Sequence, residues 1–339
     1  MKGSAQSLAK RTLRGLPLPA RRLGRYLDYL VAIRPRVHRD RQATLARGAV
    51  VLSLDFELAW AWPYAISPPV DPVETGLRER TQVPLLLKAF ADFNIPATWA
   101  TVGHLFLERC DRDSSGRAHP ELPRIPHFEN HLWRFSSGDW FQHDPCTDLR
   151  RDPAWYGPDL IERILASSVH HEIGCHSFSH PGFGVYCPPD VARAEVEACR
   201  EAMRPFGLEP RTWVFPGNDE GNYQALRDGG VRIVRSYPHS AHLALPLQRP
   251  DGLWAVHAST GLSRGEEWSI EQRFHRLMVF LEKAMARRLA MHVWLHPSLR
   301  REDYDRLLVP FLRRCAELRE QGRLDVLTMG GLVAAVSRT

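Results

Sequence analysis

The chain has 339 residues, of which 44% are apolar and 25% are charged, an ordinary composition for a soluble globular protein. No stretch approaches the roughly 18 apolar residues that a membrane-spanning helix needs, and the N-terminus does not have the pattern of a secretory signal. The six cysteines show no C-x-x-C spacing. They therefore predict reduced thiols and a cytoplasmic protein rather than a disulfide framework.

The net charge of +6 is concentrated in residues 1–47, which contain twelve Lys and Arg against only Asp28 and Asp40. The rest of the chain has 33 basic and 37 acidic residues. The body therefore offers no general basic surface, and we expect no nucleic-acid partner.

Residues 1–47 form a basic N-terminal arm that we expect to be separate from the folded domain at 48–339. Within it, residues 21–31 have apolar side chains at helical spacing, beside several arginines. A short basic amphipathic helix of this kind is suited to peripheral contact with an anionic membrane, such as the inner face of a cytoplasmic membrane. Alternatively, the helix docks on the body and leaves its arginines in water.

From residue 48 onward, strand-like and helix-like segments alternate, which predicts parallel strands with helices outside them. A segment at 108–156, rich in Pro, Gly and aromatic residues, interrupts this order as an insertion. It could overhang a site, or its tryptophans could pack it down. The expected strands are 50–55, 95–102, 172–175, 211–215, 231–235, 252–257, 291–295 and 324–327, and the expected helices are 83–93, 158–168, 188–205, 223–228, 270–285, 304–318 and a short final one.

Two acidic residues, Asp55 and Glu57, stand at the end of the first predicted strand. Side chains at i and i+2 of a strand face the same side. One carboxylate could therefore bind a metal ion while the other handles protons, and the sequence leaves open which does which. The plainer interpretation is that they cap a loop or form ion pairs.

His176 and His180 stand four residues apart, directly after a predicted strand. If this segment turns helically, both imidazoles reach the same ion. A catalytic zinc usually has three protein ligands, often two His and one carboxylate, so the first strand would supply the third. Of the neighbouring residues, we expect His171 to form a hydrogen bond in the strand and Cys175 to be buried.

His296 follows another buried strand, in Leu295-His296-Pro297. It joins Asp55, Glu57 and His176 as a polar residue at the carboxyl end of a strand, where barrels place their chemistry. A histidine in this position could instead be a satisfied strand-end residue.

These motifs resemble those of the polysaccharide deacetylase superfamily (NodB homology, carbohydrate esterase family four), from about Ala49 to the C-terminus. Ser53-Leu-Asp55-Phe-Glu57 is similar to the first family motif, His176-Ser-Phe-Ser-His180 to the second, and Leu295-His296-Pro297 to the last. The resemblance implies a distorted (β/α) barrel of about seven parallel strands with outer helices. It also implies a metal-dependent hydrolase of N- or O-acetyl groups on sugars.

The resemblance further implies a role for each residue. These roles are catalytic base for Asp55, metal ligands for Glu57, His176 and His180, catalytic acid for His296, and oxyanion donor for the backbone N–H of Gly217. Gly217 and its neighbour Asn218 could equally serve as turn residues only.

Two features depart from the family pattern. The third motif normally has an arginine two residues before its proline, where this chain has Val214 before Pro216. No counterpart of the fourth motif, an aspartate segment that orients the acid histidine, is found around residues 231–240. Both departures predict acid–base tuning that differs from that of the family, or a metal-bound protein that is weakly active or differently specialised. The departure at Val214 also motivates a non-catalytic alternative.

The sequence therefore predicts a divalent-metal deacetylase, most simply a zinc enzyme, acting on an acetylated sugar of a polysaccharide or glycolipid precursor. Two alternatives remain open at this point. One is a hydrolase of non-sugar amides or cyclic imides on the same barrel, and the other is a non-catalytic carbohydrate-binding relative.

Overall fold

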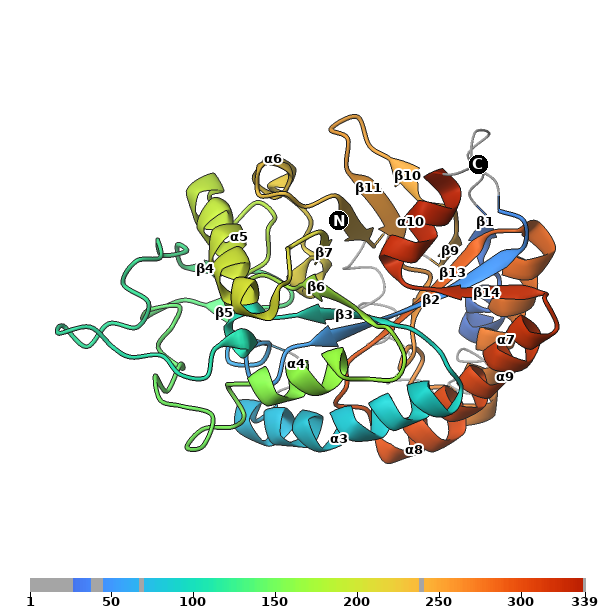
Figure 1. Cartoon of the computed structure of the whole chain (residues 1–339), viewed down its shortest axis with the longest axis horizontal. Helices are drawn as coiled ribbons and strands as arrows, with labels where there is room; N and C mark the ends of the chain where they lie inside the picture. The colour runs from blue at the N-terminus through green and yellow to red at the C-terminus, as the bar shows by residue number, and fades with distance from the viewer. Residues whose placement is uncertain (1–26, 38–44, 67–69, 238–240, 338–339) are drawn as a thin grey trace.

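A computed structural model describes residues 27–37, 45–66, 70–237 and 241–337. Ten strands form its main sheet (Figure 1). They are β2 (Gly48–Phe56), β3 (Thr98–Thr101), β6 (Glu172–Cys175), β7 (Thr212–Val214), β8 (Ile233–Ser236), β10 (Leu247–Gln248), β11 (Trp254–His257), β12 (Thr260–Gly261), β13 (Ala290–Leu295) and β14 (Leu324–Leu327).

The order of the strands is β10-β11-β8-β7-β6-β3-β2-β13-β12, with β14 beside the first half of β2. All pairs are parallel except the edge pair β10–β11. The path through the described strands stays open, so the sheet is a curled, incomplete barrel. The predicted distorted (β/α) barrel is confirmed, and each of the eight expected strands has a counterpart; the two-residue strands β10 and β12 were not foreseen.

Strand β2 lies at the centre because it is apolar along most of its length. All nine of its residues are buried, and it pairs with β3, β13 and β14. A strand covered on both faces reads as a continuous apolar run rather than as an alternating one. Asp55 is the second-last residue of β2. Burial of the strand therefore also fixes the position of this candidate site residue.

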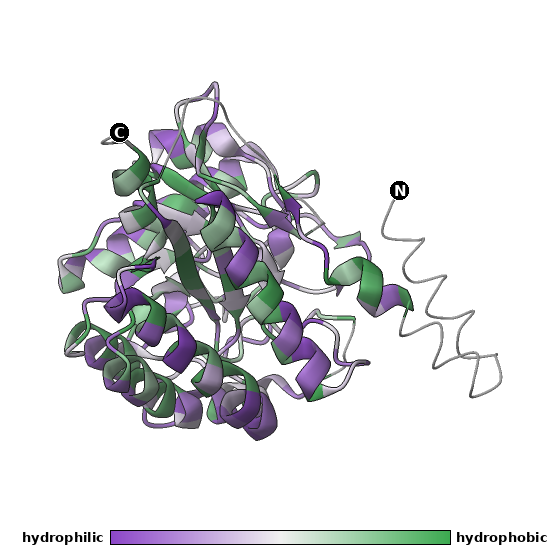
Figure 2. Ribbon diagram, turned by 90° about the vertical axis from the view of Figure 1, so that its right-hand side faces the viewer, coloured by the Kyte–Doolittle hydropathy of each residue, from purple (hydrophilic) through white to green (hydrophobic). Residues whose placement is uncertain are grey.

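Helices surround the curved sheet (Figure 1), and hydrophilic and hydrophobic residues alternate along their ribbons (Figure 2). They are α3 (Pro72–Asp92), α4 (Pro158–Leu165), α5 (Pro189–Met203), α6 (Tyr223–Asp228), α7 (Ile270–Arg287), α8 (Arg301–Asp303), α9 (Val309–Glu320) and α10 (Met329–Ser337). Four one-turn segments are η1 (Gly103–Phe106), η2 (Arg204–Phe206), η3 (Pro216–Asn218) and the π-helical η4 (Tyr304–Leu308).

The insertion at 108–156 contains little regular structure. Its described elements are the short pair β4 (Phe128–Glu129) and β5 (Arg134–Phe135). Three tryptophans, Trp133, Trp140 and Trp155, are all buried. The insertion is therefore packed against the barrel by its aromatic side chains.

The described part of the N-terminal arm contacts the body. Residues 27–32 are helical. Tyr29 is buried, and its hydroxyl oxygen lies 2.6 Å from Nδ1 of His275. Strand β1 (Arg36–Val37) pairs with β9 (His242–Leu243). These contacts favour docking of the helix, although most of the segment expected to be helical at 21–31 lies outside the described residues. Across the described part of the chain, no helix is long and apolar enough to cross a membrane.

Helix α3 begins at Pro72, well before the apolar stripe that starts at Val83. Asp71 caps it by accepting hydrogen bonds from the first backbone N–H groups. Apolar periodicity does not predict the first half of the helix, because the residues buried there include polar ones such as Glu79.

Candidate functional site

The candidate residues gather at the carboxyl ends of the central strands. Asp55 lies in β2 and Glu57 directly after it, while His176 and His296 come directly after β6 and β13. Because β13, β2, β3 and β6 are parallel neighbours, their carboxyl ends lie at one edge of the sheet. The residues are up to 241 positions apart in the chain, and the strand order brings them together.

Glu57 meets both histidines of the predicted pair. Its Oε1 atom lies 2.9 Å from Nε2 of His176 and 3.1 Å from Nε2 of His180, and all three side chains are buried. Burial alone would raise the pKa of the Glu57 carboxyl, but His296 and His180 hold it well below its usual range. Glu57 is therefore an ionised carboxylate facing two imidazoles.

The hydrogen bonds of His176 fit a cation between these groups. Its Nδ1 lies 2.8 Å from the carbonyl oxygen of Val214, to which it donates a hydrogen bond. In the neutral ring, Nε2 then presents a lone pair toward an acceptor oxygen of Glu57. A metal ion would satisfy both acceptors, and a fixed Nδ1 partner is the usual way in which a protein orients a histidine ligand.

The segment from His176 to His180 is not helical, so the helical turn considered from the spacing is wrong. Ser177 and His180 have φ angles of 57° and 68°, and these left-handed residues bend the loop so that the two rings lie 5.0 Å apart. Glu195 of α5 accepts hydrogen bonds from the N–H groups of Phe178 at 2.7 Å and Ser179 at 2.9 Å. The loop conformation is thus fixed from outside, by a buried carboxylate.

Asp55 faces a different partner from Glu57. Nη2 of Arg235 lies 2.7 Å from Oδ2 of Asp55, while Nη1 donates to Oδ1. Asn218 accepts a further hydrogen bond from Nη2 at 3.3 Å. Burial alone would raise the pKa of Asp55, but the Arg235 charge, assisted by the nearby histidines, lowers it below the usual value. Arg235 therefore holds Asp55 ionised and fixes its orientation.

His296 lies at the open side of the site. Its side chain is 33% exposed, and its Nε2 atom is 3.5 Å from Oε2 of Glu57. The ring packs near those of Trp62 and Trp294. His296 is thus more exposed than Asp55, Glu57, His176 and His180, whose side chains are all buried.

Gly217 forms a tight turn under the insertion. Its φ angle is 58°, and an added Cβ would lie 2.3 Å from Cη2 of Trp133, so glycine is required on both counts. The same tryptophan lies near the ring of His180. The insertion thus forms a wall of the site, and its tryptophans also pack it against the barrel. Both interpretations offered for this segment, overhanging the site and packing against the body, therefore apply.

Of the two residues beside the histidine pair, His171 accepts a hydrogen bond from the backbone N–H of Ala97, as predicted. Cys175 is buried, also as predicted. All six cysteines are free.

Comparison with known proteins agrees with this geometry. Residues 73–232 match the family model for polysaccharide deacetylase. This part of the chain therefore resembles the polysaccharide deacetylase family. No curated protein sequence matches it significantly.

Two solved structures share the fold. A candidate polysaccharide deacetylase from Mycobacterium smegmatis has a TM-score of 0.57 and 15% identity, over 90% of this chain and 93% of its own. Another from Pseudomonas aeruginosa PAO1 has a TM-score of 0.57 and 16% identity, over 86% of this chain and 91% of its own. At such low identity, the similarity supports the barrel architecture alone.

The matched region contains His176, His180 and Gly217 but not Asp55, Glu57 or His296. The latter three are placed by the sheet rather than by the family match. Arg235 was not recognised from the sequence as a residue of the site. The signal that could have found it is a charged residue directly after the apolar pair in strand β8. Arg235 is paired with Val214 in the β7–β8 register.

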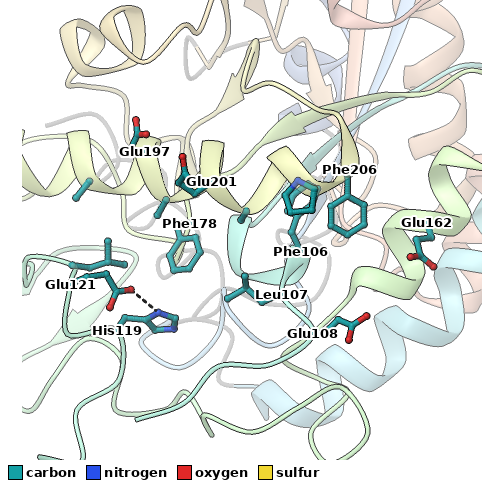
Figure 3. Close-up of a pocket in the computed structure, with 15 residues that line it drawn as sticks. Phe106, Leu107, Glu108, His119, Glu121, Glu162, Phe178, Glu197, Glu201 and Phe206 are labelled. Atoms are coloured by element: carbon teal, nitrogen blue, oxygen red, sulfur yellow. Dashed lines mark hydrogen bonds and ion pairs between the residues drawn. The ribbon is translucent and has the colours of Figure 1, made fainter. Parts of the chain in front are cut away.

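A separate cavity of about 900 Å³ lies between α5 and the start of the insertion (Figure 3). Apolar side chains such as Phe106 and Phe178 line it, together with several glutamates. Phe178 of the histidine loop lines this cavity, but none of the candidate catalytic or metal-binding residues does.

Proposed function

We propose that the protein is a metal-dependent deacetylase that hydrolyses an N-acetyl or O-acetyl group on a sugar of a polysaccharide or glycolipid precursor. The observation that carries this proposal is the division of the two carboxylates. Glu57 faces His176 and His180, while Asp55 is bound by Arg235 and left out of that group. This arrangement favours Glu57 as the metal ligand and Asp55 as the base.

The donor set of Glu57, His176 and His180 suits a catalytic divalent ion, most simply zinc. When bound, such an ion polarises the acetyl carbonyl and lowers the pKa of the attacking water.

The protein's own groups supply the proton transfers. Asp55, oriented by Arg235, accepts a proton from the attacking water. The backbone N–H of Gly217 donates a hydrogen bond to the carbonyl oxygen as negative charge develops there, a contribution of about 2.7–4 kcal/mol for a well-placed donor. His296, on the exposed side, donates a proton to the departing amine or alcohol.

Arg235 bears on the non-catalytic alternative. That alternative rested on the loss of an arginine at Val214, and a guanidinium group is nonetheless bound to Asp55 from the neighbouring strand. Hydrolysis of a cyclic imide would use the same groups and is distinguished by its substrates.

The test is acetate release by the metal-loaded protein from a panel of N- and O-acetylated sugars. We expect Asp55→Asn to lower the rate by about 10²–10⁴-fold while its metal content stays unchanged. Full activity in Asp55→Asn would refute its role as the base. Turnover of cyclic amides without acetate release would support the alternative hydrolase, and sugar binding without turnover would support the non-catalytic relative.

We also propose a cytoplasmic location, with the arm in contact with an anionic membrane. Leu27, Leu30 and Val31 are exposed apolar residues at the start of the described chain, which suits such contact. Replacing Arg21, Arg22 and Arg25 by glutamate should reduce co-sedimentation with anionic vesicles, and unchanged binding would argue against a role for the arm.

A further inference from the structure

Four side chains with metal-binding chemistry meet outside the proposed catalytic site. They are His104 of η1 and Cys110, His119 and Asp144 of the insertion, and we call them the insertion cluster. Their potential ligand atoms all lie within 4.8 Å of one another. The cluster shares no residue with the deacetylase motifs.

The distances within the insertion cluster match those of a compact metal site. Oδ2 of Asp144 lies 3.4 Å from Nε2 of His104, 3.1 Å from Nε2 of His119 and 3.4 Å from Sγ of Cys110. In a tetrahedral zinc site, with bonds of about 2.0–2.3 Å, neighbouring ligand atoms lie roughly 3.3–3.8 Å apart. The carboxylate is therefore close to the required separation from each of the other three.

The ring of His104 is poorly satisfied by the groups around it. Its side chain is completely buried, and within the part of the chain that the structure describes neither ring nitrogen makes a hydrogen bond of good geometry. Its Nε2 atom does lie 3.4 Å from Oδ2 of Asp144, close enough for an ion pair. Buried polar atoms are normally satisfied, and a metal ion would take up the lone pair of Nε2.

Other groups orient the cluster from outside. Nδ1 of His119 lies 3.3 Å from Oε1 of Glu121 (Figure 3, dashed line). The N–H of Cys146 donates to Oδ1 of Asp144 at 2.9 Å. A second hydrogen bond to a ligating histidine and a fixed carboxylate are usual features around metal sites.

The sulfur of Cys110 also has a donor. The hydroxyl of Tyr156 lies 3.2 Å from Sγ and accepts a hydrogen bond from the N–H of Thr147 at 2.9 Å. Its own proton is therefore free to point at the sulfur. Burial and the Asp144 charge nonetheless raise the pKa of the Cys110 thiol, so that without an ion the thiol donates to Asp144, and a bound ion would replace this proton. Thiolate, imidazole and carboxylate together favour zinc or a similar transition metal over magnesium or calcium.

We propose that His104, Cys110, His119 and Asp144 form a second, structural site for a zinc-like divalent ion. Four protein ligands leave no open position for a substrate, as in structural zinc sites. The ion would tie the first part of the insertion, at Cys110 and His119, and a point near its end, at Asp144, to η1 of the barrel. A segment with little regular structure gains stability from such a link.

The site also supports the wall of the catalytic site. The insertion that it clamps carries Trp133, which lies against Gly217 and near His180. Binding of the ion thereby holds Trp133 in place. This inference stands independently of the proposed deacetylase activity, because its test does not use catalysis.

The test is the absorption spectrum of the full chain reconstituted with cobalt(II). Only a thiolate ligand gives a sulfur-to-cobalt charge-transfer band, and the Glu57–His176–His180 site has no sulfur. We expect the band in the wild type and in His176→Ala/His180→Ala, its loss in Cys110→Ser, and its retention in the matched control Cys146→Ser.

A second measurement protects the test against misfolding of Cys110→Ser. After zinc reconstitution, His176→Ala/His180→Ala should retain about one ion per chain, and a strong chelator should lower its melting temperature. Absence of both the charge-transfer band and the retained ion in this variant would overturn the proposal. Loss of the band in Cys146→Ser but not in Cys110→Ser would overturn the assignment of the ligand.

Discussion

Asp55 is a buried carboxylate whose charge is balanced by a buried guanidinium. An unpaired charge at this depth would be costly, so the pairing with Arg235 explains how Asp55 remains ionised within the barrel. It also explains why Asp55 and Glu57, only two residues apart, have different environments. One faces a cation of the protein, and the other faces two imidazoles.

The register between β7 and β8 allows a direct test of this pairing. Arg235→Val should abolish most acetate release, because Asp55 loses the group that orients it. Val214 and Arg235 are paired across the two strands, so Val214→Arg in the same chain returns a guanidinium to the position that the family uses. We expect the double variant to recover part of kcat.

Measurement of kcat, KM and melting temperature for both variants separates orientation from stability. Val214→Arg alone serves as the control, since it adds a charge without removing Arg235. If the double variant regained its melting temperature but none of its activity, Arg235 would act on stability only.

The sequence alone points to the acidic pair, the histidine pair and His296 as candidates, because each lies in a short motif at the end of a strand, and the structure brings them together. Arg235 could not be predicted in the same way. Its partner is 180 residues away, and its proximity to Val214 depends on strand register, which a single sequence does not reveal. The bent loop at 176–180 is a similar case, because Glu195 and left-handed residues produce it rather than helical spacing.

At the scale of elements, helix α5 positions the histidine loop through Glu195. Burial raises the pKa of Glu195, while its hydrogen bonds to Ser179 and Phe178 oppose this shift. We expect Glu195→Ala to weaken metal binding at the catalytic site by about 10–100-fold. Glu195→Gln keeps an acceptor for the two N–H groups and should have a smaller effect.

The measurement for Glu195 is the metal concentration that gives half-maximal acetate release. Glu197→Ala is the matched control, since Glu197 lies on the same helix and pairs with Arg200 at the surface. An unchanged metal requirement in Glu195→Ala would show that the loop keeps its shape without this carboxylate.

A second element-scale feature is the buried ion pair between α7 and α8. Nη1 of Arg273 lies 2.8 Å from Oδ1 of Asp303, and both side chains are buried. Asp303→Asn leaves the guanidinium without a charged partner, which should lower the free energy of unfolding at neutral pH by about 3–5 kcal/mol. The exposed Asp305→Asn, two residues away, should leave it nearly unchanged.

The loss in Asp303→Asn should depend on pH. Burial alone would raise the pKa of Asp303, but Arg273 lowers it below the usual value. A depressed native pKa gives a stabilisation that is fully present above the unfolded pKa of about 3.9 and is lost as pH falls through the native pKa. Urea unfolding should therefore show the gap between wild type and variant narrowing in acid. A constant gap would argue against an ionised Asp303.

The alternation of strands and helices was predictable from apolar runs and periodicity, so the barrel followed from the sequence. Short edge elements such as β10 and β12 could not be predicted, because two residues carry too little pattern. The first half of α3 was missed for another reason. Buried polar residues such as Glu79 replace the apolar stripe there, although Asp71 followed by Pro72 is a readable start signal.

At the scale of the whole molecule, parallel strand order brings together groups from distant parts of the chain. Asp55, Glu57, His176 and His296 meet at one edge of the sheet, and the insertion covers this edge through Trp133. The barrel thus supplies a rigid base, and the insertion supplies a wall. The site depends on both parts, so substrate selection is expected to reside in the insertion rather than in the strands.

The central claim is that Glu57, His176 and His180 bind a metal ion that hydrolysis requires. It is tested most directly by elemental analysis of the zinc-reconstituted wild type and His176→Ala/His180→Ala, with acetate release measured on the same preparations. We predict one ion fewer per chain in the double variant and loss of acetate release. Equal metal content in the two proteins, or acetate release that survives the loss of the ion, would contradict it.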